Sequence, residues 1–386
     1  MSTLFSPLAL RALTLKNRIV ISPMCQYSAQ EGAANDWHFA HLARFALGGA
    51  GLIFSEAAAV ERNGRITHGD LGIWNDQQIP PLARITAFLK SQGAVPGIQL
   101  AHAGRKASMQ RPWHGNGPMN DSDRARGEEV WPIVAPSALP TAPGWLVPRE
   151  LTLDEIEQLK RSWEAATRRA LAAGFEVVEV HGAHGYLLHS FLSPISNKRT
   201  DRYGGSLEGR RRLPLEIAQL VRSLWPADKP VFYRISSVDG AEGGSSIEDS
   251  IGFARELKQV GIDVIDCSSG GIGGSATAAG VKRTLGFQVP FSERIRRDAQ
   301  IATMTVGLII EPHQAEQILE SGQADLIAIG RQALFNPNWP LHAEIALGVE
   351  NEFASWPMQS GWWLDKRQRS LSDEDAHRAM QPIGAV

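Results

Sequence analysis

The chain has 386 residues, of which 43% are hydrophobic and 21% charged, which is ordinary for a globular protein. Its formal net charge of −2 excludes a basic field that attracts nucleic acid, so no nucleic-acid partner is expected. The two cysteines are too few for a disulfide scaffold, a four-cysteine zinc site or an all-cysteine iron–sulfur cluster. With no secretory signal and no run of about 18 apolar residues, we expect a cytoplasmic protein without a membrane partner.

Short apolar runs alternate along the chain with longer amphipathic stretches. Most of these runs are continuously apolar, which is typical of parallel strands buried on both faces. Amphipathic stretches over 152–173, 246–260 and 312–321 predict helices between them. Such units in series favour an α/β fold with a (β/α)₈ (TIM) barrel over a doubly wound open sheet. The eight predicted strands are 19–21, 52–55, 95–100, 177–180, 231–235, 264–266, 303–306 and 326–329.

Three segments exceed what a barrel of about 250 residues needs. Residues 8–15 predict a short hairpin that caps the barrel floor. Residues 102–149 form a long loop after the third strand, rich in Gly, Pro, Asp and Trp, and loops of this length are usually lids or binding loops. We therefore predict a barrel domain over 1–349 and a C-terminal extension over 350–386, whose polar end, 365–386, could be a flexible tail.

Polar and glycine residues follow the last two predicted strands. Gly307 and Gly330 let backbone N–H groups approach an anion, and Arg331 opens the next helix. Phosphate sites in these barrels are often built from the loops after strands 7 and 8. The alternative is that these residues only form tight turns. Four further glycines within 270–274, after the sixth strand, favour a phosphate-bearing cofactor.

The densest group of potentially reactive side chains follows the fourth predicted strand, in the segment HGAHGY. His181 and His184 are three residues apart and can point at one polar atom, and the phenol of Tyr186 can hold a proton nearby. One alternative is a hydrogen-bonded histidine without function, and another is a metal pair. Zinc would require a third ligand, and no carboxylate lies between the histidines. Two imidazole donors and a phenol are better suited to binding a carbonyl oxygen and transferring a proton than to holding a metal ion, so no metal is expected.

These residues resemble the old yellow enzyme family of FMN-dependent ene-reductases. The resemblance spans about residues 4–348. It rests on three segments: KNRIVISPM at 16–24, GIQLAHAGR at 97–105, and HGAHGYLLHSFLSPISNKRTDRYGGS at 181–206. One departure is Gly209, where the family usually has asparagine, which leaves the local loop structure in doubt. The family's larger branch, with an iron–sulfur cluster and a second flavin domain, is excluded because its four clustered cysteines are missing.

The subgroup is indicated by Cys25 and Tyr27 in PMCQY. These two residues look like those of the thermophilic-like ene-reductases and bacterial xenobiotic reductases, whereas fungal and plant members usually carry threonine at the cysteine position. We expect Cys25 to tune the flavin rather than attack the substrate, because it follows Pro23 and Met24 at the ring-facing end of the first strand.

The resemblance implies a role for each matching residue. His181 and His184 should bind the substrate carbonyl oxygen, Tyr186 should donate the proton, and Tyr27 should line the pocket. Arg234 should place a cation near flavin N1. The residues expected to contact the flavin ring are Ser22, Pro23, Met24, Cys25, Ala57, Gln99 and Arg234, and those expected to hold its phosphate are Gly307, Gly330 and Arg331.

The implied reaction has two halves. Hydride passes from NADPH or NADH to FMN, and then from FMN N5 to the β-carbon of an activated alkene, while Tyr186 protonates the α-carbon. The expected substrates are small molecules such as enones, enals, maleimides, nitroalkenes or nitrate esters. Two rivals remain open: a barrel lyase using a metal or a Schiff base, which would be colourless, and an FMN-binding redox sensor without turnover.

Two adjacent tryptophans, Trp362 and Trp363, lie in the C-terminal extension. One interpretation is that both pack back onto their own barrel. The other is that Trp363 docks on a neighbouring subunit and lines its substrate pocket, as C-terminal segments do in similar subgroup members. The subgroup implies a homodimer or a homotetramer.

Overall fold

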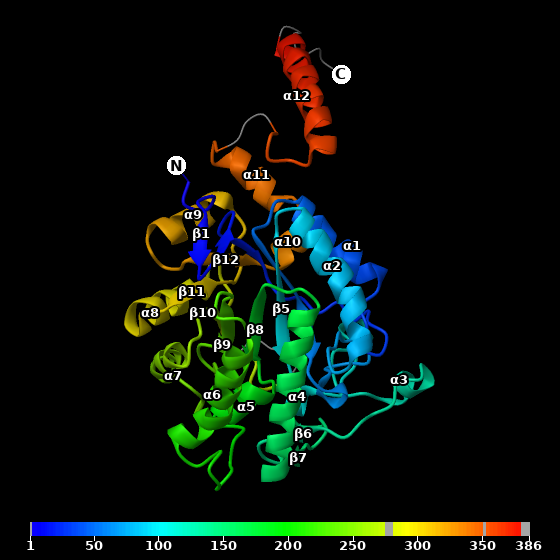
Figure 1. Ribbon diagram of the computed structural model, residues 1–386, viewed down its shortest axis with the longest axis vertical. Helices are drawn as coiled ribbons and strands as arrows, with labels where there is room; N and C mark the ends of the chain where they lie inside the picture. Colours follow the sequence, from blue (N-terminus) through cyan, green and yellow to red (C-terminus); the bar gives the residue numbers. More distant parts are fainter. Residues whose placement is uncertain (1, 275–280, 350–352, 380–386) are drawn as a thin grey trace, which may run out of the picture.

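Eight parallel strands form a closed barrel in which the first strand, β3, pairs with the last strand, β12. The computed structural model describes residues 2–274, 281–349 and 353–379, and only the backbone over 372–379. All eight predicted strands and the predicted barrel fold are confirmed (Figure 1). The barrel strands are β3 (Ile19–Ile21), β4 (Leu52–Ala59), β5 (Val95–Ala101), β8 (Val177–Gly182), β9 (Val231–Ser236), β10 (Val264–Ser268), β11 (Ala302–Thr305) and β12 (Leu326–Ile329).

Helices pack around the outside of this barrel. The predicted capping box is confirmed, because the Thr152 hydroxyl accepts from Glu155 N and the Glu155 carboxylate accepts from Thr152 N. The three predicted helices correspond to α4, α7 and α9, to within a residue at each end. The helices are α1 (Asp36–Leu47), α2 (Ile79–Ser91), α4 (Leu153–Ala172), α5 (Leu187–Leu192), α6 (Leu207–Leu224), α7 (Ile247–Gln259), α8 (Val289–Ala299), α9 (Pro312–Glu320), α10 (Arg331–Phe335) and α11 (Trp339–Ala346).

A hairpin closes the amino-terminal end of the barrel, as predicted. It consists of β1 (Leu8–Leu10) and β2 (Leu13–Leu15), which pair antiparallel. Leu10 and Leu15 are buried among residues from the strands, including Phe232 of β9. These apolar contacts exclude water from the floor, so the barrel opens only at the carboxyl ends of its strands.

The first residues of the chain are tied to α9. The Glu316 carboxylate accepts hydrogen bonds from Ser2 Oγ at 2.7 Å, Thr3 N at 2.6 Å and Leu4 N at 2.9 Å. These hydrogen bonds lower the pKa of Glu316, although burial opposes the shift. The N-terminal segment is therefore fixed to the outer helical layer.

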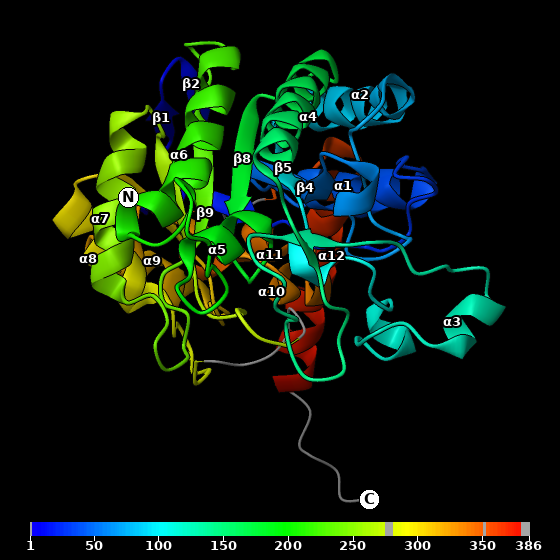
Figure 2. The same ribbon diagram turned by 90° about the horizontal axis from the view of Figure 1, so that it is seen from below.

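Two segments depart from the compact barrel. The long loop after β5 carries α3 (Asp121–Ala125), which projects sideways in both views, and the short paired strands β6 (Val134–Ala135) and β7 (Arg149–Glu150) (Figures 1 and 2). The second segment is α12 (Met358–Ala379), which extends away from the barrel at one end of the molecule (Figure 1).

The expected polar tail, residues 365–386, is helical as far as Ala379, where α12 ends. Residues 380–386 of that expected tail lie outside the described part of the chain. Among the helices of the described residues, none is long and apolar enough to cross a lipid bilayer.

Candidate active site

The two predicted histidines and the predicted tyrosine meet at the open end of the barrel. His181 lies in β8, one residue before its end, while His184 follows in a turn with a positive φ of 60°. His184 Nδ1 lies 3.4 Å from His181 Nε2, and the Tyr186 ring centre lies 5.0 Å from that of His181. The structure therefore brings these three side chains into one cluster.

Hydrogen bonds indicate which ring nitrogens carry protons. Ala183 N donates to His181 Nδ1 at 3.3 Å, so the proton of neutral His181 is assigned to Nε2. Ser268 Oγ lies 2.7 Å from His184 Nε2. Gln288 Oε1 accepts from Ser269 Oγ at 2.7 Å and lies farther from Ser268 Oγ, at 3.3 Å. Because the contact with His184 Nε2 is the shorter one, we assign the Ser268 proton to it, which places the imidazole proton on Nδ1.

Burial sets the charge of all three groups. It lowers the pKa of His181 and of His184 well below the usual value, with Arg234 as the next contribution, so both imidazoles are neutral donors. Burial raises the pKa of Tyr186 well above its usual value, with further contributions from Cys25 and Asp70. The phenol therefore keeps its proton.

The turn that carries His184 is held by groups that sequence reasoning missed. Lys106 is fully buried, and its Nζ donates to the carbonyl oxygens of His184, at 2.8 Å, and of Gly271. The Ser236 hydroxyl accepts from His184 N at 2.9 Å and donates to Gly270 O at 2.8 Å. These contacts fix a non-glycine residue in a backbone region that is otherwise uncommon.

The segment after β3 forms a second wall of the site. Tyr27 has a positive φ of 49° and contacts Trp113 edge to face, with ring centres 5.9 Å apart. Cys25 packs against the apolar cluster that contains Tyr186. The residue keeps some exposed surface, but its surroundings bury the thiol and raise its pKa well above the usual value, with Glu56 as the next contribution. The thiolate is therefore disfavoured.

The residues expected to face the flavin ring line the top of the barrel interior. Ala57 lies in β4 directly after a shift in the pairing register with β5, which begins at Phe54. Such a bulge changes the direction in which the following side chains point. Ser22 Oγ is buried without a hydrogen-bond partner among the described residues. Gln99 and Arg234 are also buried, on β5 and β9. The unpartnered hydroxyl of Ser22 and the buried cation of Arg234 each fit a polar group of a flavin ring.

The residues expected to hold the phosphate line a separate cavity of about 260 Å³ at the ends of β11 and β12, which contains Gly307, Gly330 and Arg331. A Cβ on Gly307 would lie 2.8 Å from the Phe287 ring, and a Cβ on Gly330 would lie 3.6 Å from Met24 Sδ, on the ring-facing segment. Helix α10 has only five residues, so the side chain of Arg331 and the glycine backbone, rather than a helix dipole, would supply the positive charge and donors. These residues fit FMN.

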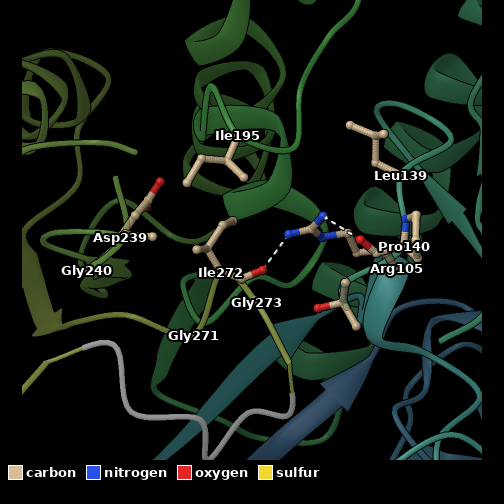
Figure 3. A pocket seen from close by; sticks show the side chains of 11 residues that line it. Arg105, Leu139, Pro140, Ile195, Asp239, Gly240, Gly271, Ile272 and Gly273 are labelled. Carbon is tan, nitrogen blue, oxygen red and sulfur yellow. Dashed lines mark hydrogen bonds between the residues drawn. The ribbon is translucent and has the colours of Figure 1, made fainter. Parts of the chain in front are cut away.

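The glycines after β10 do not reach this phosphate cavity. Gly271 packs on the backbone of His184, where a Cβ would lie 2.7 Å from His184 Cα. Gly271 also lines another cavity, of about 500 Å³, together with Arg105 and Asp239 (Figure 3). Figure 3 shows the Arg105 guanidinium bonded to the carbonyls of Pro140 and Ile272, opposite Asp239. Gly271 therefore packs against the turn that carries His184 and does not line the cavity of Gly307, Gly330 and Arg331.

Trp363 lies apart from the cluster. Trp362 and Trp363 stand in α12 with 56% and 67% of their surfaces exposed, and their rings contact each other edge to face. The interpretation that both tryptophans pack back onto their own barrel is wrong.

Comparison with known proteins identifies relatives along nearly the whole chain. The profile of the NADH:flavin oxidoreductase / NADH oxidase family matches residues 3–350. A protein named NADPH dehydrogenase from Geobacillus sp. (strain WCH70) is 44% identical over 361 residues, which cover 93% of this chain and 98% of that protein. A second NADPH dehydrogenase, from Bacillus subtilis (strain 168), is 44% identical over 349 residues, or 90% and 96% of the two chains.

The fold is also that of a solved relative. The structure of the old yellow enzyme homologue from Zymomonas mobilis superimposes with a TM-score of 0.72 at 27% identity, covering 90% of this chain and 93% of that one. With the family profile matching most of the chain, the protein belongs to the NADH:flavin oxidoreductase / NADH oxidase family and is an FMN-dependent NAD(P)H oxidoreductase of the old yellow enzyme type.

Proposed function

We propose that this enzyme reduces the carbon–carbon double bond of activated alkenes, namely small unsaturated carbonyl or nitro compounds. The observation that carries the proposal is the 3.4 Å distance between His181 Nε2 and His184 Nδ1. Both nitrogens are assigned protons, and two N–H groups this close together can donate to one oxygen that lies within hydrogen-bond distance of both. A carbonyl or nitro oxygen is such an acceptor, and the two donors stabilise the negative charge that develops on it.

Bound FMN would supply the hydride acceptance and donation, using NADPH or NADH as the reductant. Ser22, Pro23, Met24, Cys25, Ala57, Gln99 and Arg234 would hold its ring, and Gly307, Gly330 and Arg331 would hold its phosphate. Tyr186 would give its phenolic proton to the substrate α-carbon. Because its proton is retained by burial, Tyr186 is suited to a general acid.

The decisive experiment follows both hydrogens that are added. The enzyme is incubated without oxygen in D₂O with unlabelled NADPH and 2-cyclohexen-1-one. We expect cyclohexanone that carries solvent deuterium on the α-carbon and protium from the reductant on the β-carbon. NADPH oxidation that requires oxygen and leaves the enone intact would contradict alkene reduction and favour the FMN-binding sensor.

The state of Cys25 argues against that sensor. A redox-responsive cysteine requires an accessible thiolate, and burial disfavours the Cys25 thiolate. We propose instead that Cys25 tunes the flavin potential.

We also propose that residues 350–386 act as an assembly segment outside the barrel domain of residues 1–349. In a homodimer or homotetramer, α12 would dock on a second copy of the chain, and Trp363 would line the substrate pocket of that copy. Support comes from the position of α12 away from its own barrel and from its two exposed tryptophans (Figure 1). Cutting the chain before Gly361 should reduce the particle size in light scattering and change KM for bulky enones, with FMN retained. Unchanged size and KM would contradict the docking.

A further inference from the structure

A layer of buried polar side chains crosses the barrel interior beneath the catalytic cluster. Glu179 lies two residues after Val177 in β8, and Asp266 lies two residues after Val264 in β10. Both valines belong to the interior apolar cluster, so both carboxyl groups point into the barrel. Glu179 and Asp266 have no exposed surface, and Arg234, on the intervening strand β9, is 8% exposed.

The contacts within this layer are specific. Gln99 Nε2 donates to Glu179 Oε1 at 2.8 Å. Arg234 Nε lies 3.1 Å from Asp266 Oδ2, without the alignment of a hydrogen bond. Glu179 and Asp266 face the same interior layer from the strands on either side of Arg234, near enough for each to shift the pKa of the other. Among the described residues, no N–H or hydroxyl donor reaches Glu179 Oε2 or either oxygen of Asp266.

Two carboxyl groups in this arrangement hold one proton between them. Two carboxylates that share a dry site cannot both ionise, because their like charges repel. Burial, followed by Asp266, raises the pKa of Glu179 well above its usual value, and burial also raises the pKa of Asp266. One shared proton can lie between Glu179 Oε2 and one oxygen of Asp266, and the pair then carries one negative charge beside the guanidinium of Arg234.

We propose that Glu179 and Asp266 are positioning residues that act through Arg234: their single shared charge sets how strongly the site prefers reduced over oxidised FMN. The inference rests on the proposed placement of the FMN ring against Arg234. A cation at the ring favours reduced FMN, which carries an additional negative charge. The negative pair behind that cation offsets part of its effect.

Because the charge is shared, either carboxyl group can carry it alone. In Glu179→Gln, the new amide donates to an ionised Asp266, so the charge remains. In Asp266→Asn, the new amide donates to Glu179 and, together with Arg234, stabilises its carboxylate against the cost of burial. Only the double amide variant removes the charge. We therefore expect strongly non-additive effects of two isosteric substitutions.

The test measures the midpoint potential of bound FMN, and with it the ratio of affinities for reduced and oxidised FMN. Glu179→Gln should leave this ratio within about threefold of wild type. The double variant should raise it at least tenfold, which is about 30 mV for a two-electron couple. Tyr233→Phe is the matched control: its buried hydroxyl lacks a partner, but it lies beside the Cβ position of Gly182 on the other face of β9, and we expect no change. An FMN-loaded double variant with the wild-type ratio would overturn the inference, and so would a shift in Glu179→Gln as large as in the double variant.

A second measurement needs neither FMN nor a folded double variant. Infrared spectroscopy of the wild-type protein at pH 9 should show a protonated carboxyl group that is absent in Glu179→Gln. At this pH Asp70, whose pKa is raised by burial to about 7, is ionised and does not contribute. A wild-type spectrum without a protonated carboxyl group would overturn the shared proton. A wild-type protein that shows this band but binds no FMN would contradict the proposed function and leave the shared proton supported.

Discussion

Replacing Lys106 by methionine should remove a pH dependence of stability. Lys106 is fully buried, and burial, with a smaller contribution from Arg105, lowers its pKa to about 7. An unfolded lysine has a pKa of about 10.4. Between these two values the unfolded state binds the proton that the folded state has lost, so the free energy of unfolding rises with pH.

The size of this rise follows from the two pKa values. Where the unfolded state binds one proton more than the folded state, the free energy of unfolding rises by about 1.4 kcal/mol per pH unit. At pH 7 the rise is half as steep, because the folded lysine is still half protonated. Integration from pH 7 to 9 gives about 2 kcal/mol. Lys106→Met has no titrating group here, so its stability should lack this gain. Other groups, including the thiols of Cys25 and Cys267, contribute equally to both proteins and cancel in the comparison.

Urea unfolding of wild type and variant at pH 7 and pH 9 measures the difference. A suitable control is Lys160→Met. Although burial opposes it, hydrogen bonds to Glu157 and Glu216 raise the pKa of Lys160, so this lysine stays protonated in both states. Wild type and Lys160→Met should change in parallel with pH. If Lys106→Met gains as much stability as wild type between pH 7 and 9, Lys106 does not titrate in this range.

Three further outcomes are expected. Tyr186→Phe should slow enone reduction by about 10²- to 10⁴-fold while flavin reduction by NADPH stays largely intact, and stopped-flow measurements of both halves would reveal a structural role if they slowed equally. His181→Ala combined with His184→Ala should abolish tight binding of phenols, followed by their long-wavelength charge-transfer band; unchanged affinity would refute the paired donors. Cys25→Ala should keep FMN and some activity but shift the flavin potential, whereas an FMN-loaded protein without any activity would favour covalent catalysis by the thiol.

The barrel and the cluster of two histidines and a tyrosine could be predicted because both leave local signals. Continuous apolar runs mark parallel strands, and the chemistry of a barrel collects at strand ends, so His181, His184 and Tyr186 could be grouped before their geometry was known. Glu179 also left a signal, a single carboxylate inside the run VVEV, but its partner Asp266 lies on another strand.

Other features depend on contacts that no sequence pattern encodes. Lys106 and Ser268 act on the histidines from other loops and strands, which only the closed barrel brings together. The sequence of α12 is mostly polar and has no stripe of apolar residues at helical spacing, so the pattern that predicts a helix was missing there. Two adjacent tryptophans indicate a contact surface, but the sequence does not say whether the partner surface belongs to the same barrel or to a neighbouring subunit.

The hydrogen bond between Ser2 and Glu316 joins residues 314 positions apart, and the first barrel strand, β3, pairs with the last, β12. The ribosome therefore releases the first strand long before its partner exists. At about 5–20 residues per second, roughly 15–60 s separate the two. Throughout this interval the nascent chain exposes an unpaired edge that other chains can extend. Ring closure thus makes the last quarter of translation the step at which this protein either completes its fold or requires a chaperone.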